Sequence, residues 1–225
     1  VFPEGVTSIG DYAFEFCNNL DYVVIPKSLT SIGFFAFAGC FDIYITDIAQ
    51  WCNISGLSNM LSGKNGDLYL NNKLLTDLEI PNGVSLISDC AFRGFESIVT
   101  VAIPEGLTSI GVSVFNECIG LTSIIIPSSV VSIGNHAFSG CNKLSDIFIT
   151  DIAKWCAISG LSNLMDNGSS SVFKNLYVNN ELVTDLVIPD GVISIDNYMF
   201  NKCGSFTTVV LPDSVTSIGG SAFCD

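Results

Sequence analysis

Residues 121–138 read LTSIIIPSSVVSIGNHAF, and the same arrangement of apolar residues around one proline returns along the whole chain. All prolines occupy this one place: Pro3, Pro26, Pro81, Pro104, Pro127, Pro189 and Pro212. Four of the six intervals between them are 23 residues long, and the sixth residue after each proline is always Ile. A fixed period of about 20–50 residues with apolar residues in register is typical of a solenoid, in which each coil buries its inward side chains against its neighbours.

Each unit also predicts its own local structure. The stretch before the proline is β-branched and alternates in polarity, which indicates a short strand that the proline ends because it has no N–H. Stacked coils then place these strands about 4.8 Å apart in a parallel sheet. The Val-Thr-Ser-Ile stretch predicts a second, shorter ribbon on the other side, and Ala-Phe-x-x-Cys the connecting turn. The eleventh residue after each proline is expected to form a column through the core: Phe14, Phe37, Phe92, Phe115, Phe138, Phe200 and Phe223.

The two longer intervals, 55 and 62 residues, hold a second kind of coil that is itself duplicated. Residues 45–52 read ITDIAQWC and residues 149–156 read ITDIAKWC, with threonine where a proline would stand. Thr-Asp followed by apolar residues at i, i+3 and i+4 predicts a capped short helix in each copy. Residues 68–75, LYLNNKLL, and 176–183, LYVNNELV, place Asn-Asn between two apolar runs, which predicts a hairpin-like turn.

The recurring Leu-x-x-Ile-x-Ile-Pro, Val-Thr-Ser-Ile-Gly and Ala-Phe motifs, with a following Cys, closely resemble the BspA-type leucine-rich repeats. The resemblance covers essentially the whole chain, and the Trp-Cys coils resemble an interruption found in some members. Three positions depart from the pattern: Phe95 replaces the Cys, and Ser88 and Asp196 replace the Gly. The resemblance implies a repeat solenoid, a leucine-rich-repeat-like right-handed superhelix of mainly short parallel β-strands with a few short helices, and a concave sheet.

We expect one domain over residues 1–225, a solenoid of about nine coils. The longer Trp-Cys coils are expected at roughly 46–80 and 150–188. Both ends fall inside a repeat, so we expect the sequence to be a fragment of a longer chain. The start lacks a basic segment followed by an apolar one, and therefore shows no signal peptide.

Residues of a strand point alternately inward and outward, so two rows should face solvent on the sheet. The second residue before each proline or its threonine gives an apolar row interrupted once: Val24, Tyr44, Glu79, Ala102, Ile125, Phe148, Val187 and Val210. The fourth residue before gives an acidic and hydroxyl row: Tyr22, Asp42, Asp77, Thr100, Ser123, Asp146, Asp185 and Thr208. One interpretation is an interaction surface. The other is that exposed β-branched residues simply suit strands. The candidate ligand-binding residues are Val24, Tyr44, Ile125, Phe148, Val187, Val210, Tyr22, Asp77, Asp146 and Asp185.

The chain carries 22 acidic and 8 basic residues and a net charge of -14. This charge repels the phosphates of nucleic acids and anionic lipid headgroups, so we expect neither as a partner. No run of about 18 apolar residues occurs, because polar residues interrupt every hydrophobic stretch, so the sequence predicts no insertion into a membrane.

The residues needed for catalysis or metal binding are sparse. His136 is the only histidine, there is no C-x-x-C, and no nucleophile, zinc-protease or phosphate-loop motif occurs, so we expect no enzyme, cofactor or metal site. Asp77 and Asp185 would be the carboxylate pair of a glycosidase, although solvated repeats explain them as well. Trp51 and Trp155 would serve as sugar platforms, or instead anchor the short helices to the core.

Nine cysteines raise the question of disulfides. Five of them share one position of the repeat: Cys17, Cys40, Cys118, Cys141 and Cys203. Stacked thiols would lie within disulfide range. The replacement by Phe95 favours a buried apolar filler, because free Cys packs as a small hydrophobe.

The resemblance implies adhesion to extracellular-matrix components. The expected function is therefore a secreted or cell-surface module that binds a host matrix protein or a neighbouring-cell surface protein through the concave sheet. A structural stalk that carries another domain is the alternative. A carbohydrate-binding or carbohydrate-active protein is a third.

Overall fold

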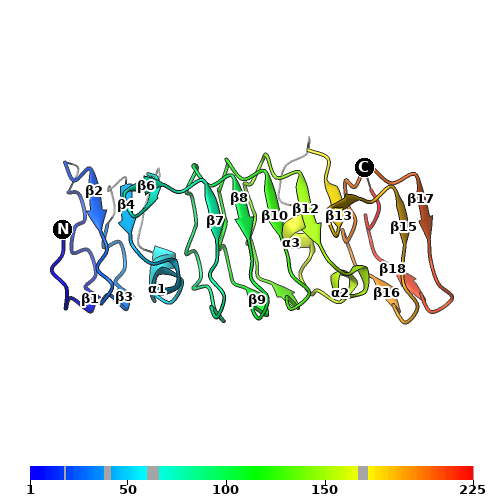
Figure 1. Cartoon of the computed structure of the whole chain (residues 1–225), viewed down its shortest axis with the longest axis horizontal. Coiled ribbons are helices and arrows are strands. Elements are labelled where there is room, and N and C mark those ends of the chain that lie inside the picture. Colours follow the sequence, from blue (N-terminus) through cyan, green and yellow to red (C-terminus); the bar gives the residue numbers. More distant parts are fainter. Residues whose placement is uncertain (18, 38–41, 60–65, 167–171, 225) are drawn as a thin grey trace.

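The computed structural model describes residues 1–17, 19–37, 42–59, 66–166 and 172–224. Coils stack along one long axis, with the amino terminus at one end and the last strands at the other (Figure 1). Short parallel strands dominate, and the few helices are short. The predicted fold class, a leucine-rich-repeat-like solenoid, is confirmed.

One long side of the stack carries the strands that precede the prolines, together with those of the longer coils. These are β2 (Tyr22–Val24), β4 (Asp42–Ile45), β5 (Leu68–Leu70), β6 (Lys73–Leu74), β7 (Asp77–Glu79), β8 (Thr100–Ala102), β10 (Ser123–Ile125), β12 (Asp146–Ile149), β13 (Asn175–Val178), β14 (Glu181–Leu182), β15 (Asp185–Val187) and β17 (Thr208–Val210). This first ribbon has three pieces, ordered β2-β4-β5-β6, β7-β8-β10-β12-β13-β14 and β15-β17. The expected sheet therefore forms, but it is interrupted after β6 and after β14.

The opposite side carries the second, shorter ribbon that the Ser-Ile pairs predict. Its strands are β1 (Ser8–Ile9), β3 (Ser31–Ile32), β9 (Ser109–Ile110), β11 (Ser132–Ile133), β16 (Ser194–Ile195) and β18 (Ser217–Ile218). They pair in parallel as β1 with β3, β9 with β11 and β16 with β18. This prediction is confirmed.

The predicted hairpins interrupt the first ribbon. β5 pairs with β6 and β13 pairs with β14, both antiparallel. Asn71 and Asn72 have φ of 52° and 64°, and Asn179 and Asn180 have φ of 51° and 67°. Two successive residues with positive φ are characteristic of the tight turn that favours Asn, so the Asn-Asn prediction is confirmed in both copies.

The two predicted helices are α1 (Ile48–Cys52) and α2 (Ile152–Cys156). The carboxylate of Asp47 accepts a hydrogen bond from the Gln50 amide at 3.0 Å, and Asp151 accepts one from Lys154 at 3.0 Å. These caps satisfy one of the free amides at each helix start, as the Thr-Asp pattern predicts. The 3-10 turn η1 (Leu57–Asn59) and the helix α3 (Ser162–Met165) are two further elements that the repeat pattern does not predict.

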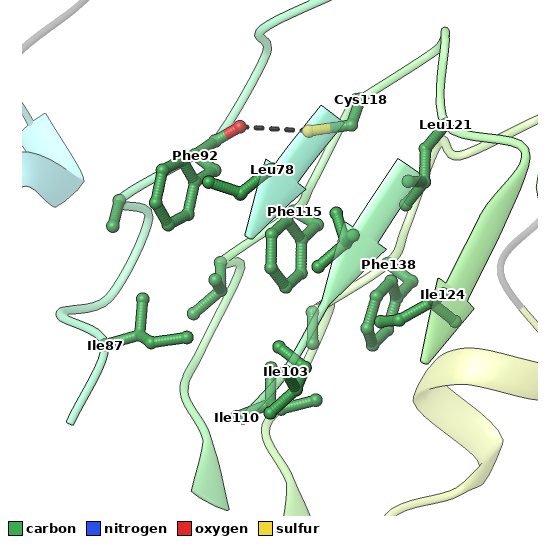
Figure 2. Close-up of a cluster of buried hydrophobic side chains, with 14 of the residues drawn as sticks. Leu78, Ile87, Phe92, Ile103, Ile110, Phe115, Cys118, Leu121, Ile124 and Phe138 are labelled. Atoms are coloured by element: carbon green, nitrogen blue, oxygen red, sulfur yellow. Dashed lines mark hydrogen bonds between the residues drawn. The ribbon is translucent and has the colours of Figure 1, made fainter. Parts of the chain in front are cut away.

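The phenylalanine column lies between the two ribbons (Figure 2). Phe37, Phe92, Phe115, Phe138 and Phe200 are buried, and the terminal members of the column are partly buried. The ring of Phe115 stacks on Phe92 at 5.7 Å and on Phe138 at 5.4 Å between centroids. The predicted column is confirmed, and each ring fills the space that its neighbours leave.

Thiols lie beside this column. Cys118 donates a hydrogen bond to the Phe92 carbonyl at 2.9 Å (Figure 2), and Cys141 donates one to the Phe115 carbonyl at 3.0 Å. Burial raises the pKa of Cys141 to about 12, and the pKa of Cys118 lies well above its usual value for the same reason. The buried-thiol prediction therefore holds at these positions. Cys17, Cys52, Cys90, Cys118 and Cys156 are free thiols.

The prediction of a buried thiol is wrong for Cys17, which is exposed. Cys118 donates to a carbonyl of the coil before it, whereas Cys17 lies in the first of the described coils. Cys203 is buried, and Phe95 fills the same position with a buried ring. Cys40 lies outside the described residues.

In coils that follow another proline-containing coil, the glycine after the repeat isoleucine is required by that preceding coil. A Cβ built on Gly134 would lie 2.7 Å from the carbonyl carbon of Gly111. Ser88 and Asp196 replace this glycine in the coils that follow the Trp-Cys coils, where a helix-containing coil precedes them. The Ser88 amide donates to the Cys52 carbonyl at the end of α1, and a hollow of about 320 Å³ borders Asp196. Glycine is therefore needed where a coil stacks on another proline-containing coil, and not where it follows a Trp-Cys coil.

Replacing Gly134 with Ala should lower the free energy of unfolding by about 1–3 kcal/mol, because the new methyl group meets backbone that cannot move aside. Gly10→Ala is the matched control, because nothing lies within 4 Å of its Cβ position. It should change the same quantity by less than about 0.5 kcal/mol. Urea denaturation of both variants measures the difference, and equal losses would contradict the stacking explanation.

Candidate ligand-binding face

The outer face of the first ribbon is set by the alternation of its strands. In β10, Ile124 is fully buried, and Ile126 just after the strand is 1% exposed. Ile125 between them is 47% exposed. Because successive residues of a strand point to opposite faces, burying one set fixes the other set in solvent.

The outer apolar row follows the strand register. In the longest piece, the residues aligned across neighbouring strands are Glu79, Ala102, Ile125, Phe148, Tyr177 and Leu182. In the piece before it they are Val24, Tyr44, Tyr69 and Leu74, and in the last piece Val187 and Val210. The structure thus brings the predicted row onto one face, in three segments rather than one stripe.

Two stacked aromatic pairs belong to this row. Tyr44 stacks on Tyr69 with ring centroids 4.4 Å apart and planes 3° apart. Phe148 stacks on Tyr177 at 4.5 Å and 14°. The ring centroid of Tyr22, from the neighbouring acidic and hydroxyl row, lies 5.1 Å from that of Tyr44. Each pair lies where a longer coil adds a strand. The two copies of that coil therefore give two similar stacked aromatic pairs on this face.

Sequence reasoning missed Tyr69 and Tyr177. Both lie in strands that are not followed by proline, so alignment on the prolines left them out. The signal that would have found them is the repeated Leu-Tyr before Asn-Asn, whose alternation places the tyrosine on the same face as Tyr44 and Phe148.

The acidic row ties neighbouring coils together. Asp77 accepts hydrogen bonds from the Thr100 and Thr76 hydroxyls at 2.7 and 2.8 Å, and Asp185 accepts from Thr208 at 2.6 Å. These bonds favour the charged form and hold the pKa of both carboxyls below the usual value. Asp146 accepts a bond from the Asn175 side chain at 2.7 Å. The row therefore contributes to the register of the stack as well as to its surface charge.

The structure does not assemble the carboxylate pair of a glycosidase. Asp77 begins one piece of the ribbon and Asp185 begins the next, with β8, β10, β12, β13 and β14 between them. At about 4.8 Å per strand the two carboxylates are more than about 20 Å apart. A glycosidase places its two carboxyl groups about 5–9.5 Å apart.

Both tryptophans are core residues. Trp51 is fully buried and its indole N–H donates to the Ala91 carbonyl at 2.8 Å, whereas Trp155 is 1% exposed and its indole nitrogen has no hydrogen-bond partner. Neither ring presents a flat face to a sugar. The interpretation that they anchor the short helices is confirmed.

The described part of the chain contains no cluster of three or more His, Cys, Asp or Glu residues that could hold a metal ion. His136 is exposed and lies in a turn of the coil, with φ of 58°. Among the helices of the described residues, none has the length and apolar character needed to span a bilayer.

A search among curated proteins finds no match to this chain. Solved structures are similar in fold. A leucine-rich repeat protein from Eubacterium ventriosum is 20% identical over 99% of this chain and 81% of that one, with a TM-score of 0.47. One from Bacteroides ovatus is 21% identical over 97% and 67%, with a TM-score of 0.43. A leucine rich cell surface protein from Faecalibacterium prausnitzii is 22% identical over 99% and 64%, also with a TM-score of 0.43.

A family model gives the closer assignment. The model of the BspA type leucine rich repeat region matches in six copies, over residues 1–60, 66–159 and 169–225. These segments cover nearly the whole sequence and agree with the proline-centred units and the stacked coils described above. The chain therefore belongs to the BspA-type leucine-rich repeat family.

Proposed function

We propose that this chain is an extracellular binding module of a cell-surface or secreted protein, and that it holds a protein ligand on the outer face of the first ribbon. The observation that carries the proposal is the aligned row of apolar and aromatic side chains on that face. The ligand would be a matrix protein or a surface protein of a neighbouring cell. Membership of the BspA-type family supports this class of function and this location.

The physics of the face suits such a ligand. Exposed apolar side chains that lie in one row lose water together when a partner covers them, and the cores of protein interfaces are enriched in aromatic residues. Ile125 is 47% exposed, and the stacked pair of Phe148 and Tyr177 continues the row beside it. The backbone of the ribbon is already fixed by parallel pairing, so little ordering would be required on binding.

Ile125→Asp and Phe148→Asp test the proposal. Each places a charge in the middle of the row, so each should raise the Kd for a bound matrix protein by more than about tenfold, or about 1.4 kcal/mol. The melting temperature should change little, because neither side chain is in the core. Surface plasmon resonance against a panel of purified matrix and cell-surface proteins provides the measurement.

Val131→Asp is the matched control for these variants. Val131 is 55% exposed but lies beside β11 on the second ribbon. The Val131→Asp variant should bind the ligand as tightly as the parent chain. If all three variants bind alike, the row is not the binding surface.

A structural stalk is the second candidate, and one observation favours it. The carboxylates of Asp77 and Asp185 are engaged by threonines of the next coil, which stiffens the stack. A stalk would bind no member of the panel, so the parent chain and the three Asp variants would all give no binding signal.

A further inference from the structure

Among the described strands, the first ribbon has a free edge at its first interruption. β7 is the last strand of its sheet, and among the described strands it pairs with β8 alone. The hairpin strand β6 is the last strand of the preceding sheet, and its recorded pairing is with β5. Figure 1 shows β6 and β7 as successive strands along the stack. The hydrogen-bonded ladder that runs through the other coils therefore stops between them.

The direction of the β7 peptide groups follows from its bonds to β8. The Ile80 amide donates to the Ala102 carbonyl at 3.0 Å, and the Thr76 carbonyl accepts from the Thr100 amide at 3.2 Å. In a parallel ladder alternate residues bond to the same neighbour. The peptide groups of Asp77 and Glu79 therefore face the other way, toward β6.

Two adjoining hollows lie along this edge. The larger, about 410 Å³, is bordered by Asp77, Glu79 and Pro81 on the β7 side and by Leu70 and Asn71 on the hairpin side. The smaller, about 190 Å³, shares Leu70 and Asp77 and continues to Thr76. Together they form the β7 groove, which follows the strand from residue 76 to residue 81.

The lining of the β7 groove is acidic. Among the described residues that border it are the acidic Asp47, Asp77 and Glu79 and the cationic Lys73. Glu79 is also the one acidic residue in a row that is otherwise apolar. The whole chain carries a net charge of -14, so its field also attracts cationic partners. Leu70 and Pro81 add apolar walls on which the stem of a long cationic side chain can rest.

We propose that the β7 groove binds an extended segment of a partner protein that carries lysine or arginine. The segment adds to the free edge of β7 as a further strand, with its peptide groups bonded to those of Asp77 and Glu79. Its cationic side chains meet the carboxylates of Asp77 and Glu79. This is a second binding site, separate from the row centred on Ile125 and Phe148.

A synthetic peptide of nine residues, alternating lysine and valine and labelled with a fluorophore, is the probe. Its anisotropy with the full chain at about 150 mM salt should show saturable binding, at an ionic strength where charge attraction alone is strongly screened. Glu79→Lys should weaken binding by at least roughly tenfold, because it places a like charge against the peptide. Glu4→Lys makes the same change in net charge on an exposed side chain in the first coil, and should weaken it less than about twofold.

Two further measurements address strand addition itself. A peptide of the same sequence, N-methylated at every residue, should lose binding, because the methyl groups block both edges of the added strand. Hydrogen exchange should show protection of the Asp77 and Glu79 amides by the unmethylated peptide. Equal weakening by both lysine substitutions, or equal binding of the methylated peptide, would overturn the proposal.

A second copy of this chain is the competing occupant of the edge. Sedimentation would then show a dimer that Glu79→Lys disrupts, and the peptide would not bind, which would also overturn the proposal. Phe148→Asp should leave peptide binding intact while it weakens binding of the matrix-protein ligand. Failure of either site is therefore recognised separately.

Discussion

Phe115→Ala should lower the free energy of unfolding by about 3–5 kcal/mol, because it removes a fully buried ring and leaves a cavity. The cost is high at this position because Phe115 contacts aromatic rings on both sides, at 5.7 Å from Phe92 and 5.4 Å from Phe138. A solenoid coil has no partners beyond its neighbours, so the stack cannot close such a gap from elsewhere. Chemical denaturation followed by circular dichroism measures the loss.

Phe173→Ala is the control for the column. Phe173 is 60% exposed and should contribute less than about 1 kcal/mol. A similarly small loss for Phe115→Ala would mean that the column does not carry the core. A large loss of unfolding free energy for Phe115→Ala, with little loss for Phe173→Ala, would show that the stacked rings stabilise the contacts between coils.

Lys174→Met should raise the free energy of unfolding near neutral pH by about 2 kcal/mol. Lys174 is fully buried, and its ammonium group donates one hydrogen bond, to the Leu144 carbonyl at 2.8 Å. Burial, and then the nearby Lys202, lower its pKa from 10.5 to about 8. That depression corresponds to roughly 3 kcal/mol of penalty for the charged form, from which about 1 kcal/mol is deducted for the hydrogen bond that Met cannot make.

The pH dependence gives the sharper test of Lys174. Between pH about 8 and 10.5 the unfolded chain holds a proton that the folded chain has released, so this lysine makes stability rise with pH. Below pH 8 both states are protonated and the full penalty is present. The advantage of Lys174→Met should therefore shrink above pH 8 and vanish or reverse near pH 10.5.

Buried thiols have the opposite effect on stability, which they make fall as the pH rises above 9. Burial raises the pKa of Cys52, Cys141 and Cys156 from 9.0 to about 12, so they stay protonated in the folded chain while the unfolded chain ionises. Their contribution to stability is lost from pH 9 upward. Subtracting the variant from the parent at each pH cancels this effect for Cys52 and Cys156, whereas the charge of Lys174 lowers the pKa of Cys141, so that thiol changes with the variant. Lys143→Met, at an exposed position, is the control, and an advantage of Lys174→Met that stays constant with pH would contradict the assignment.

The sequence was sufficient for the elements that depend on local chemistry. The proline period located the strands, Asp47 and Asp151 marked the helix starts, and the Asn-Asn pairs marked the hairpins. Each of these rests on a preference that acts within a few residues: a missing N–H, a capping oxygen, or tolerance of positive φ. The same holds for the phenylalanine column, since its period repeats with the strands.

The conformation of the ninth residue after each proline was not accessible in this way. All seven residues have φ between 49° and 62°: Tyr12, Phe35, Cys90, Ser113, His136, Tyr198 and Ser221. None is Gly or Asn, so composition gives no sign of a left-handed backbone, which costs roughly 1–2 kcal/mol per residue. In several coils a hydrogen bond to the next coil accompanies it, such as that from the Ser113 amide to the Asn135 carbonyl at 3.0 Å.

The amino-acid sequence by itself determined which side chains enter the core and which face water, because that choice follows from apolar spacing within each coil. Only the tertiary structure decided which outward residues become neighbours. The hairpins of the longer coils insert strands without proline, so they bring Tyr69 beside Tyr44 and Tyr177 beside Phe148 and leave the edge of β7 open. Contacts of that kind depend on how whole coils stack, and no local preference of a single segment encodes them.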